Sequence, residues 1–181
     1  MEGHLVGEKP EVTRERQRAV GDTSQETPRS GGFRGNFHHT LDEKGRISVP
    51  SEYRGVLAQS REQCVVLTNF ICDGARCLEG FLLEEWEAFE QKLKSRSRFD
   101  PQLRQLENFY LSRAARCVVD GSGRINVPNY LRTYAGLEKD AVFTASLHGF
   151  RIWDTRVWEL VFREAESALL ENPALFKDVD L

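Results

Sequence analysis

Two short segments of the chain place acidic and basic side chains around a glycine in the same order. They read Leu41-Asp42-Glu43-Lys44-Gly45-Arg46-Ile47-Ser48-Val49-Pro50 and Val119-Asp120-Gly121-Ser122-Gly123-Arg124-Ile125-Asn126-Val127-Pro128. A guanidinium such as that of Arg46 or Arg124 can bind a phosphate bidentately or contact a guanine edge in the major groove of DNA. Each arginine can instead pair with the aspartate of its own segment, Asp42 or Asp120, and stiffen a turn. The residue types alone leave both chemistries open.

The two segments differ in charge at one position. Lys44 adds a positive charge beside Arg46, whereas Ser122 holds the matching position beside Arg124. A serine can hydrogen-bond a phosphate but brings no charge, so the two segments need not contribute equally. Both segments have an aspartate that can bond the backbone ahead of it and a glycine that can adopt positive φ. The residues expected to shape the turns are Asp42, Gly45, Asp120 and Gly123.

Strands must enter and leave these turns. We expect the entering strands over 37–41 and 117–119. Beyond the glycine, apolar residues alternate with a polar one, as in Ile47, Ser48 and Val49, which is the two-residue period of a half-buried strand. A proline ends each leaving strand and leads into a short helix. These helices are predicted over 51–59 and 129–135, the second closed by Gly136.

The two segments belong to a longer internal repeat. Asp120 follows Asp42 by 78 positions, whereas the tryptophan of the second copy follows that of the first by only 72 positions, at Trp158 and Trp86. The first copy therefore holds about six extra residues, which we place in a loop from Cys72 to Gly80. An arginine also stands four positions after the proline of each copy, at Arg54 and Arg132.

Longer helices are predicted to close each half. The first spans 83–95 and carries its apolar residues at helical spacing. Aspartates that can cap a helix precede the next two, at Asp100 and Asp154. The last helix places Trp158 and Phe162 on one face, and we expect these aromatic residues in the core.

Composition and repeat divide the chain into three parts. Residues 1–32 are rich in charges and lack a sustained apolar period, so we predict a disordered N-terminal extension. The first copy of the repeat then occupies 33–101. The second occupies 102–181 and ends in a helical tail.

The overall charge balance excludes some classes of protein. The 181 residues contain 25 Lys+Arg and 28 Asp+Glu, for a net charge of −3, and 40% are hydrophobic. This excludes a generally basic coat protein for nucleic acid but not a local basic site. No apolar run approaches the roughly 20 residues of a membrane span, so we expect a cytoplasmic protein that does not bind a membrane.

The sequence predicts neither a metal nor a cofactor. The four cysteines are irregularly spaced and are expected to remain reduced thiols without a zinc ion. His38 and His39 are neighbours on a predicted strand and point to opposite faces, which is poor geometry for joint metal binding. Phosphate-binding glycine-rich loops and hydrolase motifs are absent from the sequence, so no small-molecule substrate is expected.

Two other functions compete with nucleic-acid binding. An enzyme could bring Asp42 and Asp120 together across a pseudo-twofold axis, as aspartic proteases do, but the adjacent arginines would hold both carboxylates ionised. We therefore assign no catalytic residue. An oligomeric scaffold or antitoxin-like interaction module would use the repeated hairpins for assembly, and its tail over 171–181 could dock on a partner.

Several of these features together resemble one known family. The run Phe33-Arg34-Gly35, both segments and the Trp86 region are similar to the MraZ family of bacterial transcriptional regulators, which carry two AbrB-like (SpoVT-AbrB) units in tandem. The resemblance covers residues 33–181. It implies an α+β, β-rich fold in which two swapped-hairpin units form a pseudo-twofold β-barrel flanked by helices. It also implies that protomers assemble into homo-oligomeric rings.

The same resemblance implies a function. Family members bind short direct repeats in the promoter of the division and cell-wall gene cluster, usually to repress it. The implied partners are double-stranded promoter DNA, which includes the protein's own promoter, and further copies of the chain, in a nucleoid-associated protein. By motif match, the implied DNA-binding residues are Arg46, Lys44, Arg124, Ser122 and Arg34.

Overall fold

The computed structural model describes Met1, residues 32–172 and Ala174. Most of the predicted extension over 1–32, and the chain from 175 onward, lie outside these described residues. Within them the protein is α+β and rich in antiparallel strands, as expected. Among the described helices, none combines the length and the apolar character needed to cross a membrane.

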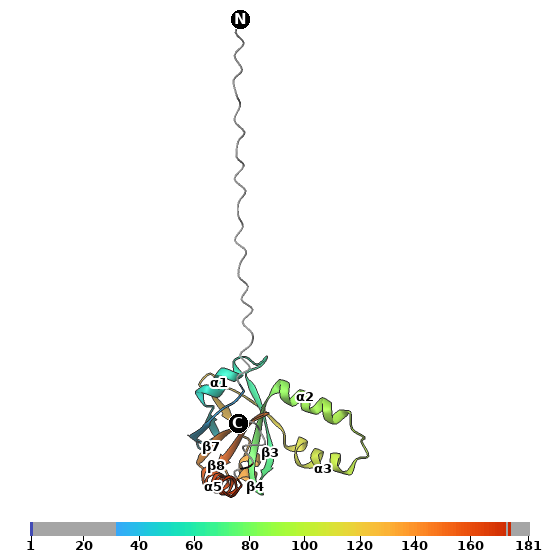
Figure 1. Cartoon of the computed structure of the whole chain (residues 1–181), viewed down its shortest axis with the longest axis vertical. Coiled ribbons are helices and arrows are strands. Elements are labelled where there is room, and N and C mark those ends of the chain that lie inside the picture. The colour runs from blue at the N-terminus through green and yellow to red at the C-terminus, as the bar shows by residue number, and fades with distance from the viewer. Residues whose placement is uncertain (2–31, 173, 175–181) are drawn as a thin grey trace. The chain divides into compact units, whose positions relative to one another are not determined.

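Eight strands, five α-helices and one short 3₁₀ helix make up residues 32–172 (Figure 1). The strands are β1 (Asn36–Thr40), β2 (Arg46–Ser48), β3 (Cys64–Cys72), β4 (Ala75–Leu82), β5 (Ala115–Val118), β6 (Arg124–Asn126), β7 (Asp140–Ser146) and β8 (Gly149–Asp154). The helices are α1 (Ser51–Leu57), α2 (Leu83–Lys94), α3 (Pro101–Phe109), α4 (Asn129–Ala135) and α5 (Thr155–Glu171), with a 3₁₀ turn at Leu111–Arg113. The strands that flank the turns and the short helices after them agree with prediction to within two residues.

One antiparallel sheet joins the two halves in the order β1-β7-β8-β4-β3-β5. The halves exchange strands at its edges, because β1 of the first half pairs with β7 of the second and β5 of the second pairs with β3 of the first. Strands β2 and β6 form a separate two-stranded ribbon. Within residues 32–172 the pairing leaves β1 and β5 as edge strands, so a closed barrel is not seen there.

The two faces of the sheet pack against different layers. The inner face packs with the β2–β6 ribbon, α1 and α4 into the main core, which includes Ile47, Tyr53, Ile125, Leu131 and Phe143. The alternate residues of the same strands point to the outer face. There α2 and α5 each cover a smaller cluster, built around Trp86 and around Trp153 respectively. The core thus contains equivalent residues from both copies of the repeat.

The predicted loop from Cys72 to Gly80 is wrong. Cys72 pairs with Ala75 across a tight turn of Asp73 and Gly74, both at positive φ, and β4 then runs through the middle of the sheet. The extra residues of the first copy are spread out instead. Strands β3 and β4 are each two residues longer than β7 and β8, and six residues precede β3 where four precede β7. Because β4 is buried on both faces, it lacks the alternation that marks a strand in sequence.

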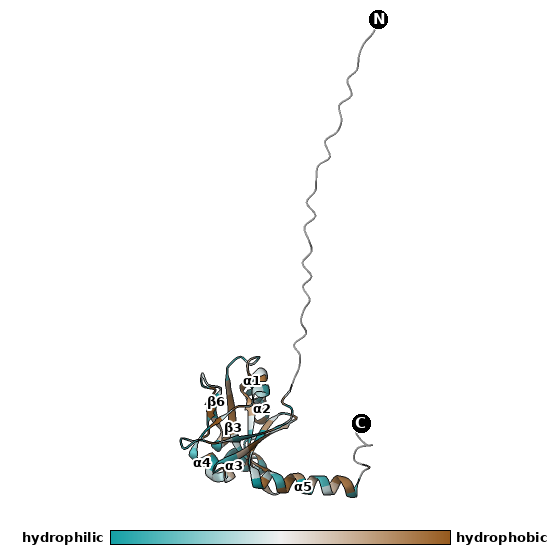
Figure 2. Cartoon of the chain, turned by 90° about the vertical axis from the view of Figure 1, so that its left-hand side faces the viewer, coloured by the Kyte–Doolittle hydropathy of each residue, from teal (hydrophilic) through white to brown (hydrophobic). Residues whose placement is uncertain are grey.

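Both predicted aspartate caps are confirmed. Asp100 accepts a hydrogen bond from the backbone N–H of Gln102 at 2.9 Å, and Asp154 accepts one from Arg156 at 3.0 Å. The expectation that the aromatic residues of the last helix lie in the core is wrong for Phe162, which is 50% exposed. The reason is that α5 projects beyond the body that its first turns cover (Figure 2).

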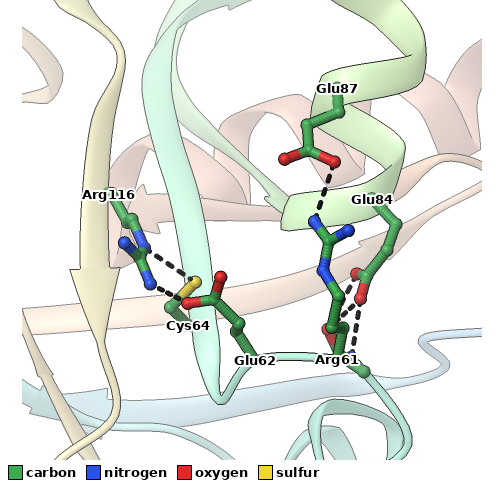
Figure 3. A network of polar contacts seen from close by, with 7 residues as sticks. Arg61, Glu62, Cys64, Glu84, Glu87 and Arg116 are labelled. Atoms are coloured by element: carbon green, nitrogen blue, oxygen red, sulfur yellow. Dashed lines mark hydrogen bonds and ion pairs between the residues drawn. The ribbon is translucent and has the colours of Figure 1, made fainter.

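Helices α2 and α3 form an arm, in which α2 leads away from the sheet and α3 returns to it (Figure 1). At the start of the arm, Glu84 accepts hydrogen bonds from the hydroxyl of Ser60 at 2.7 Å and the backbone N–H of Arg61 at 2.6 Å. The guanidinium of Arg61 reaches Glu87, one turn further along α2, at 2.8 Å (Figure 3). The connection before β3 is therefore tied to the first turn of the arm.

The returning end of the arm is fixed by buried polar contacts. The Tyr110 hydroxyl donates to Glu79 on β4 at 2.5 Å, and the Thr68 hydroxyl on β3 donates to the Tyr110 carbonyl at 2.5 Å. Burial raises the pKa of the Glu79 carboxyl, while the bond from Tyr110 and the charge of Arg151 oppose that rise. Both ends of the arm are thus held against the sheet.

Candidate nucleic-acid interface

One carboxylate organises the first turn. Asp42 Oδ1 accepts hydrogen bonds from the backbone N–H groups of Lys44 and Arg46, both at 2.9 Å. Asp42 Oδ2 accepts one from Arg46 Nε at 2.7 Å and lies 2.6 Å from Arg46 Nη2. Gly45, with φ of 77°, donates its N–H to the Asp42 carbonyl at 2.8 Å. The aspartate therefore fixes both the backbone of the turn and the direction of the guanidinium.

The second turn repeats this geometry. Asp120 Oδ1 accepts from the backbone N–H groups of Ser122 at 2.8 Å and Arg124 at 3.0 Å, and Asp120 Oδ2 accepts from Arg124 Nε at 3.0 Å. Gly123 has φ of 74° and donates to the Asp120 carbonyl at 2.8 Å. Each arginine thus pairs with its own aspartate, yet the side chains of Arg46 and Arg124 remain 34% and 32% exposed. The ion pairs therefore leave about a third of each arginine side chain exposed.

The β2–β6 ribbon brings the two arginines to one surface. Ile47 lies opposite Ile125 at the centre of the ribbon, and both are fully buried against the core. Neighbouring residues of a strand point to opposite faces, so Arg46 and Arg124 share the outer face of the ribbon. Their register places them diagonally, where Cα atoms are about 7–8 Å apart. Two arginines from motifs that lie far apart in sequence therefore share one surface.

Each turn is also covered by an arginine from the other half. A Cβ atom on Gly45 would lie 2.6 Å from Cζ of Arg132, and one on Gly123 would lie 2.2 Å from Nη1 of Arg54. The backbone of the first turn also bonds to the other half, because Val127 donates its N–H to the Gly45 carbonyl at 2.9 Å. We noted in the sequence that Arg54 and Arg132 recur at one distance from the proline but assigned them no role. That equal spacing was the signal that both belong to the site.

The two covering arginines are held differently. Arg132 is half-buried, and its Nε donates to the Val127 carbonyl at 3.1 Å. Arg54 is exposed and makes no side-chain hydrogen bond within residues 32–172. An open hollow of about 440 Å³ lies beside it, lined also by Gln63 and the second turn. The first turn is consequently the more tightly enclosed.

The remaining predicted DNA-binding residues occupy different places. Lys44 and Ser122 are exposed in the turns, beside the arginines of the ribbon. Arg34 is exposed as well, but it precedes β1, whereas the first turn follows that strand. Five residues at about 3.4 Å each put it about 17 Å from the turn. The structure therefore places four of the five predicted residues on the ribbon and its two turns, and leaves Arg34 apart.

Hydrogen bonds from the arginines keep the turn aspartates ionised. The backbone N–H and the side chain of Arg46 lower the pKa of Asp42 to about 2. The equivalent groups of Arg124 lower the pKa of Asp120. A pair of carboxylates that shares a proton needs one raised pKa, which is the opposite of what these aspartates show.

The described residues also offer little for a metal ion. Among residues 32–172, no three His, Cys, Asp or Glu side chains gather closely enough to hold one. His38 is exposed, whereas His39 is half-buried and packs edge-on against the ring of Phe143 at 5.7 Å. Burial and the charge of Arg54 lower the pKa of His39.

Comparison with known proteins identifies one family. The sequence matches the family described as "MraZ protein, putative antitoxin-like" twice, over residues 33–109 and 110–176. A relative from Thioalkalivibrio sulfidiphilus named transcriptional regulator MraZ is 40% identical over 152 residues, which cover 79% of this chain and 99% of the relative. Relatives of the same name from Ligilactobacillus salivarius and Lachnoclostridium phytofermentans are 39% and 41% identical, covering 82% and 70% of this chain and 99% and 84% of the relatives.

Proposed function

The chain belongs to the MraZ family, and from that premise we propose that it is a non-catalytic transcriptional regulator that binds double-stranded promoter DNA through its two turns. The observation that carries this proposal is the shared outer face of the ribbon, where Arg46 and Arg124 lie diagonally. The relatives are named transcriptional regulators, which supports the same function.

The size of the ribbon suits a DNA groove. The major groove of B-DNA is about 12 Å wide and admits a two-stranded β-ribbon. Two guanidinium groups that start about 7–8 Å apart can both reach into one such groove. Each aspartate restrains its arginine before DNA arrives, so less side-chain freedom is lost on binding.

The residues of the turns make different kinds of contact with DNA. Arg46 and Arg124 supply bidentate contacts to guanine edges or phosphates. Lys44 adds one phosphate contact at the first turn, and Ser122 offers an uncharged hydrogen bond at the second. Arg34 lies too far from the turns to join this contact and would reach DNA only along a separate stretch.

The finer properties follow from the family resemblance. The protein acts as a repressor of the division and cell-wall gene cluster and of its own promoter, in the cytoplasm at the nucleoid. Copies of the chain form a homo-oligomeric ring that binds short direct repeats, so that modest contacts per subunit add up through effective concentration. This explains how a chain of net charge −3 binds DNA without a basic domain.

The test is fluorescence anisotropy with DNA from immediately upstream of the protein's own gene, beside scrambled DNA, over a salt series. Wild type is expected to bind its own DNA selectively, with affinity falling as salt rises because phosphate contacts release counterions. The variant Arg46→Ala/Arg124→Ala is expected to lose this binding while its oligomer size stays the same. Arg104→Ala/Arg113→Ala removes equal charge away from the ribbon and serves as the control.

The competing function is a scaffold or antitoxin-like module. The ion pairs of Arg46 and Arg124 with their own aspartates favour it, because such pairs also stiffen a turn without DNA. If wild type binds neither DNA even at low salt, the regulator proposal fails and the scaffold takes its place.

A further inference from the structure

The first of two unpartnered surfaces is the arm tip, which we define as residues 92–100. Phe99 is 79% exposed there, more than most apolar side chains of residues 32–172. Arg96 pairs with Asp100 at 2.7 Å. The other basic side chains of the tip are exposed and form no ion pair within the described chain, namely Lys92, Lys94 and Arg98. An exposed aromatic ring surrounded by unpaired positive charge is typical of an interaction surface.

The second surface is the α5 hollow, an open hollow of about 390 Å³ between α5 and the edge strand β1. Its apolar wall is formed by Trp158, which is half-buried, and Phe162, with ring centroids 5.8 Å apart. Asn36 and His38 of β1 form the opposite wall. The exposed carboxylates of α5 form no ion pair within the described chain, and they are Glu159, Glu164, Glu166 and Glu171.

We infer that the arm tip of one copy docks in the α5 hollow of another, with Phe99 seated against Trp158 and Phe162. This inference rests on the proposed self-assembly of the chain and names the surfaces that mediate it. An aromatic anchor in an apolar hollow with a charged rim is the usual centre of a protein interface.

Charge complementarity favours a second copy as the partner. The tip presents three unpaired cations, whereas α5 presents four unpaired carboxylates and one unpaired cation, Arg163, which also lines the hollow. Glu159 lies on the rim of the hollow itself, where it can meet Arg98 beside the docked ring. Opposite charges steer two such surfaces together and fix their register. Duplex DNA could accept the basic tip but would be repelled by α5, so it accounts for only one of the two surfaces.

The two surfaces do not meet within one chain. The arm leaves the body sideways in Figure 1, whereas α5 points toward the viewer there and projects sideways in Figure 2. Both ends of the arm are held by hydrogen bonds to the sheet and to the connection before β3, so the tip keeps its direction. A contact between unlike surfaces is heterologous and propagates from copy to copy, closing into a ring where the rotation allows.

The test compares full-length variants by light scattering after size-exclusion chromatography, with circular dichroism to confirm folding. Phe99→Ala and Phe162→Ala should each weaken assembly by about thirtyfold or more. An equimolar mixture of the two variants should form a dimer and nothing larger, because it restores one intact contact per pair. Leu147→Ala is the matched control, since Leu147 is 98% exposed in the β7–β8 turn and lies on neither surface.

Charge exchange gives an independent readout. Arg98→Glu and Glu159→Arg should each reduce assembly, and the two changes in one chain should restore it. A monomeric wild type would overturn the proposed self-assembly together with this inference. A wild type that assembles while Phe99→Ala and Phe162→Ala assemble equally well would overturn the inference alone. Loss of affinity for a single DNA site in Arg98→Glu, without a change in mass, would assign the tip to DNA instead.

Discussion

The two turns of the ribbon share a backbone but differ in their surroundings. In each turn one aspartate accepts hydrogen bonds from two backbone N–H groups. The same aspartate pairs with the arginine that stands two residues after Lys44 or Ser122. The first turn carries an extra positive charge and lies under Arg132, which is bonded to the Val127 carbonyl. The second carries none and lies under the exposed Arg54, beside an open hollow.

This difference separates what forms the site from what adjusts it. The aspartate, glycine and arginine are common to both turns, so they set the geometry. The lysine, the serine and the covering arginines differ, so they set charge and rigidity. We expect the first turn to be the more rigid and the more strongly attracted to phosphate, and the second to be the more adaptable.

Substituting the turn glycines should give the largest difference between the two turns, measured as loss of unfolding free energy. Gly45→Ala should cost about 3 kcal/mol of unfolding free energy, from an unfavourable positive φ and a clash with the bonded Arg132. Gly123→Ala should cost about 1–2 kcal/mol, because the exposed Arg54 can move aside. Urea unfolding measures both.

Gly74→Ala provides the baseline for these two variants. Gly74 has φ of 77°, like Gly45, but nothing lies within 4 Å of a Cβ placed there. The unfolding free energy that Gly74→Ala loses should therefore reflect only the cost of positive φ for alanine. Equal losses at all three glycines would show that Arg132 does not constrain the first turn.

Removing either ribbon arginine should have the next largest effect. Arg46→Ala and Arg124→Ala should each reduce affinity for the upstream DNA by about 2 kcal/mol, or roughly thirtyfold, since each removes one bidentate contact. Anisotropy titration at fixed salt measures the loss. An Arg124→Ala variant with unchanged affinity would mean that only the first turn contacts DNA.

Substituting Ser122 by lysine or Lys44 by serine should change DNA affinity by smaller amounts, in opposite directions. Ser122→Lys should strengthen binding and steepen the plot of log affinity against log salt by about 0.9, because one more phosphate is neutralised. Lys44→Ser should weaken binding and flatten the same plot by about as much. Slopes that do not change in either variant would remove both positions from the phosphate contacts.

The smallest effect concerns pH. The pKa of Asp42 is about 2 in the folded chain, below its unfolded value, so the stabilisation it gives is present above the unfolded pKa. It is lost progressively as pH falls from that unfolded pKa through about 2. Carboxyl NMR should therefore show Asp42 ionised throughout pH 4–7, and Asp120 titrating below its ordinary value. A midpoint near 4 for Asp42 would show that its bonds to Arg46 do not persist in solution.

Local signals in the sequence predicted the parts that depend on local chemistry. The turn aspartates and glycines, the caps at Asp100 and Asp154, and the left-handed Gly136 after α4 act through neighbours within a few residues. The internal repeat also predicted equivalent strands and helices in both halves. The domain boundary between 101 and 102 stays a prediction.

Contacts between distant segments were not predictable from these signals. The covering of Gly45 by Arg132 depends on how the halves cross, which no single segment encodes. The sequence predicts a loop over most of β4 because the central place of this strand in the sheet buries both faces and removes the alternation. Phe162 has the spacing of a core residue, and only the projection of α5 shows that the core ends before it.

The exchange of edge strands has a consequence for synthesis on the ribosome. Asn36 at the start of β1 pairs with Thr144, so this strand waits for about a hundred further residues before its partner exists. At about 5–20 residues per second, that delay is of the order of 5–20 s. During this time β3 also lacks β5, and the nascent first half exposes unpaired strand edges that favour aggregation. The protein therefore completes its sheet only once β8, which ends at Asp154, has been translated.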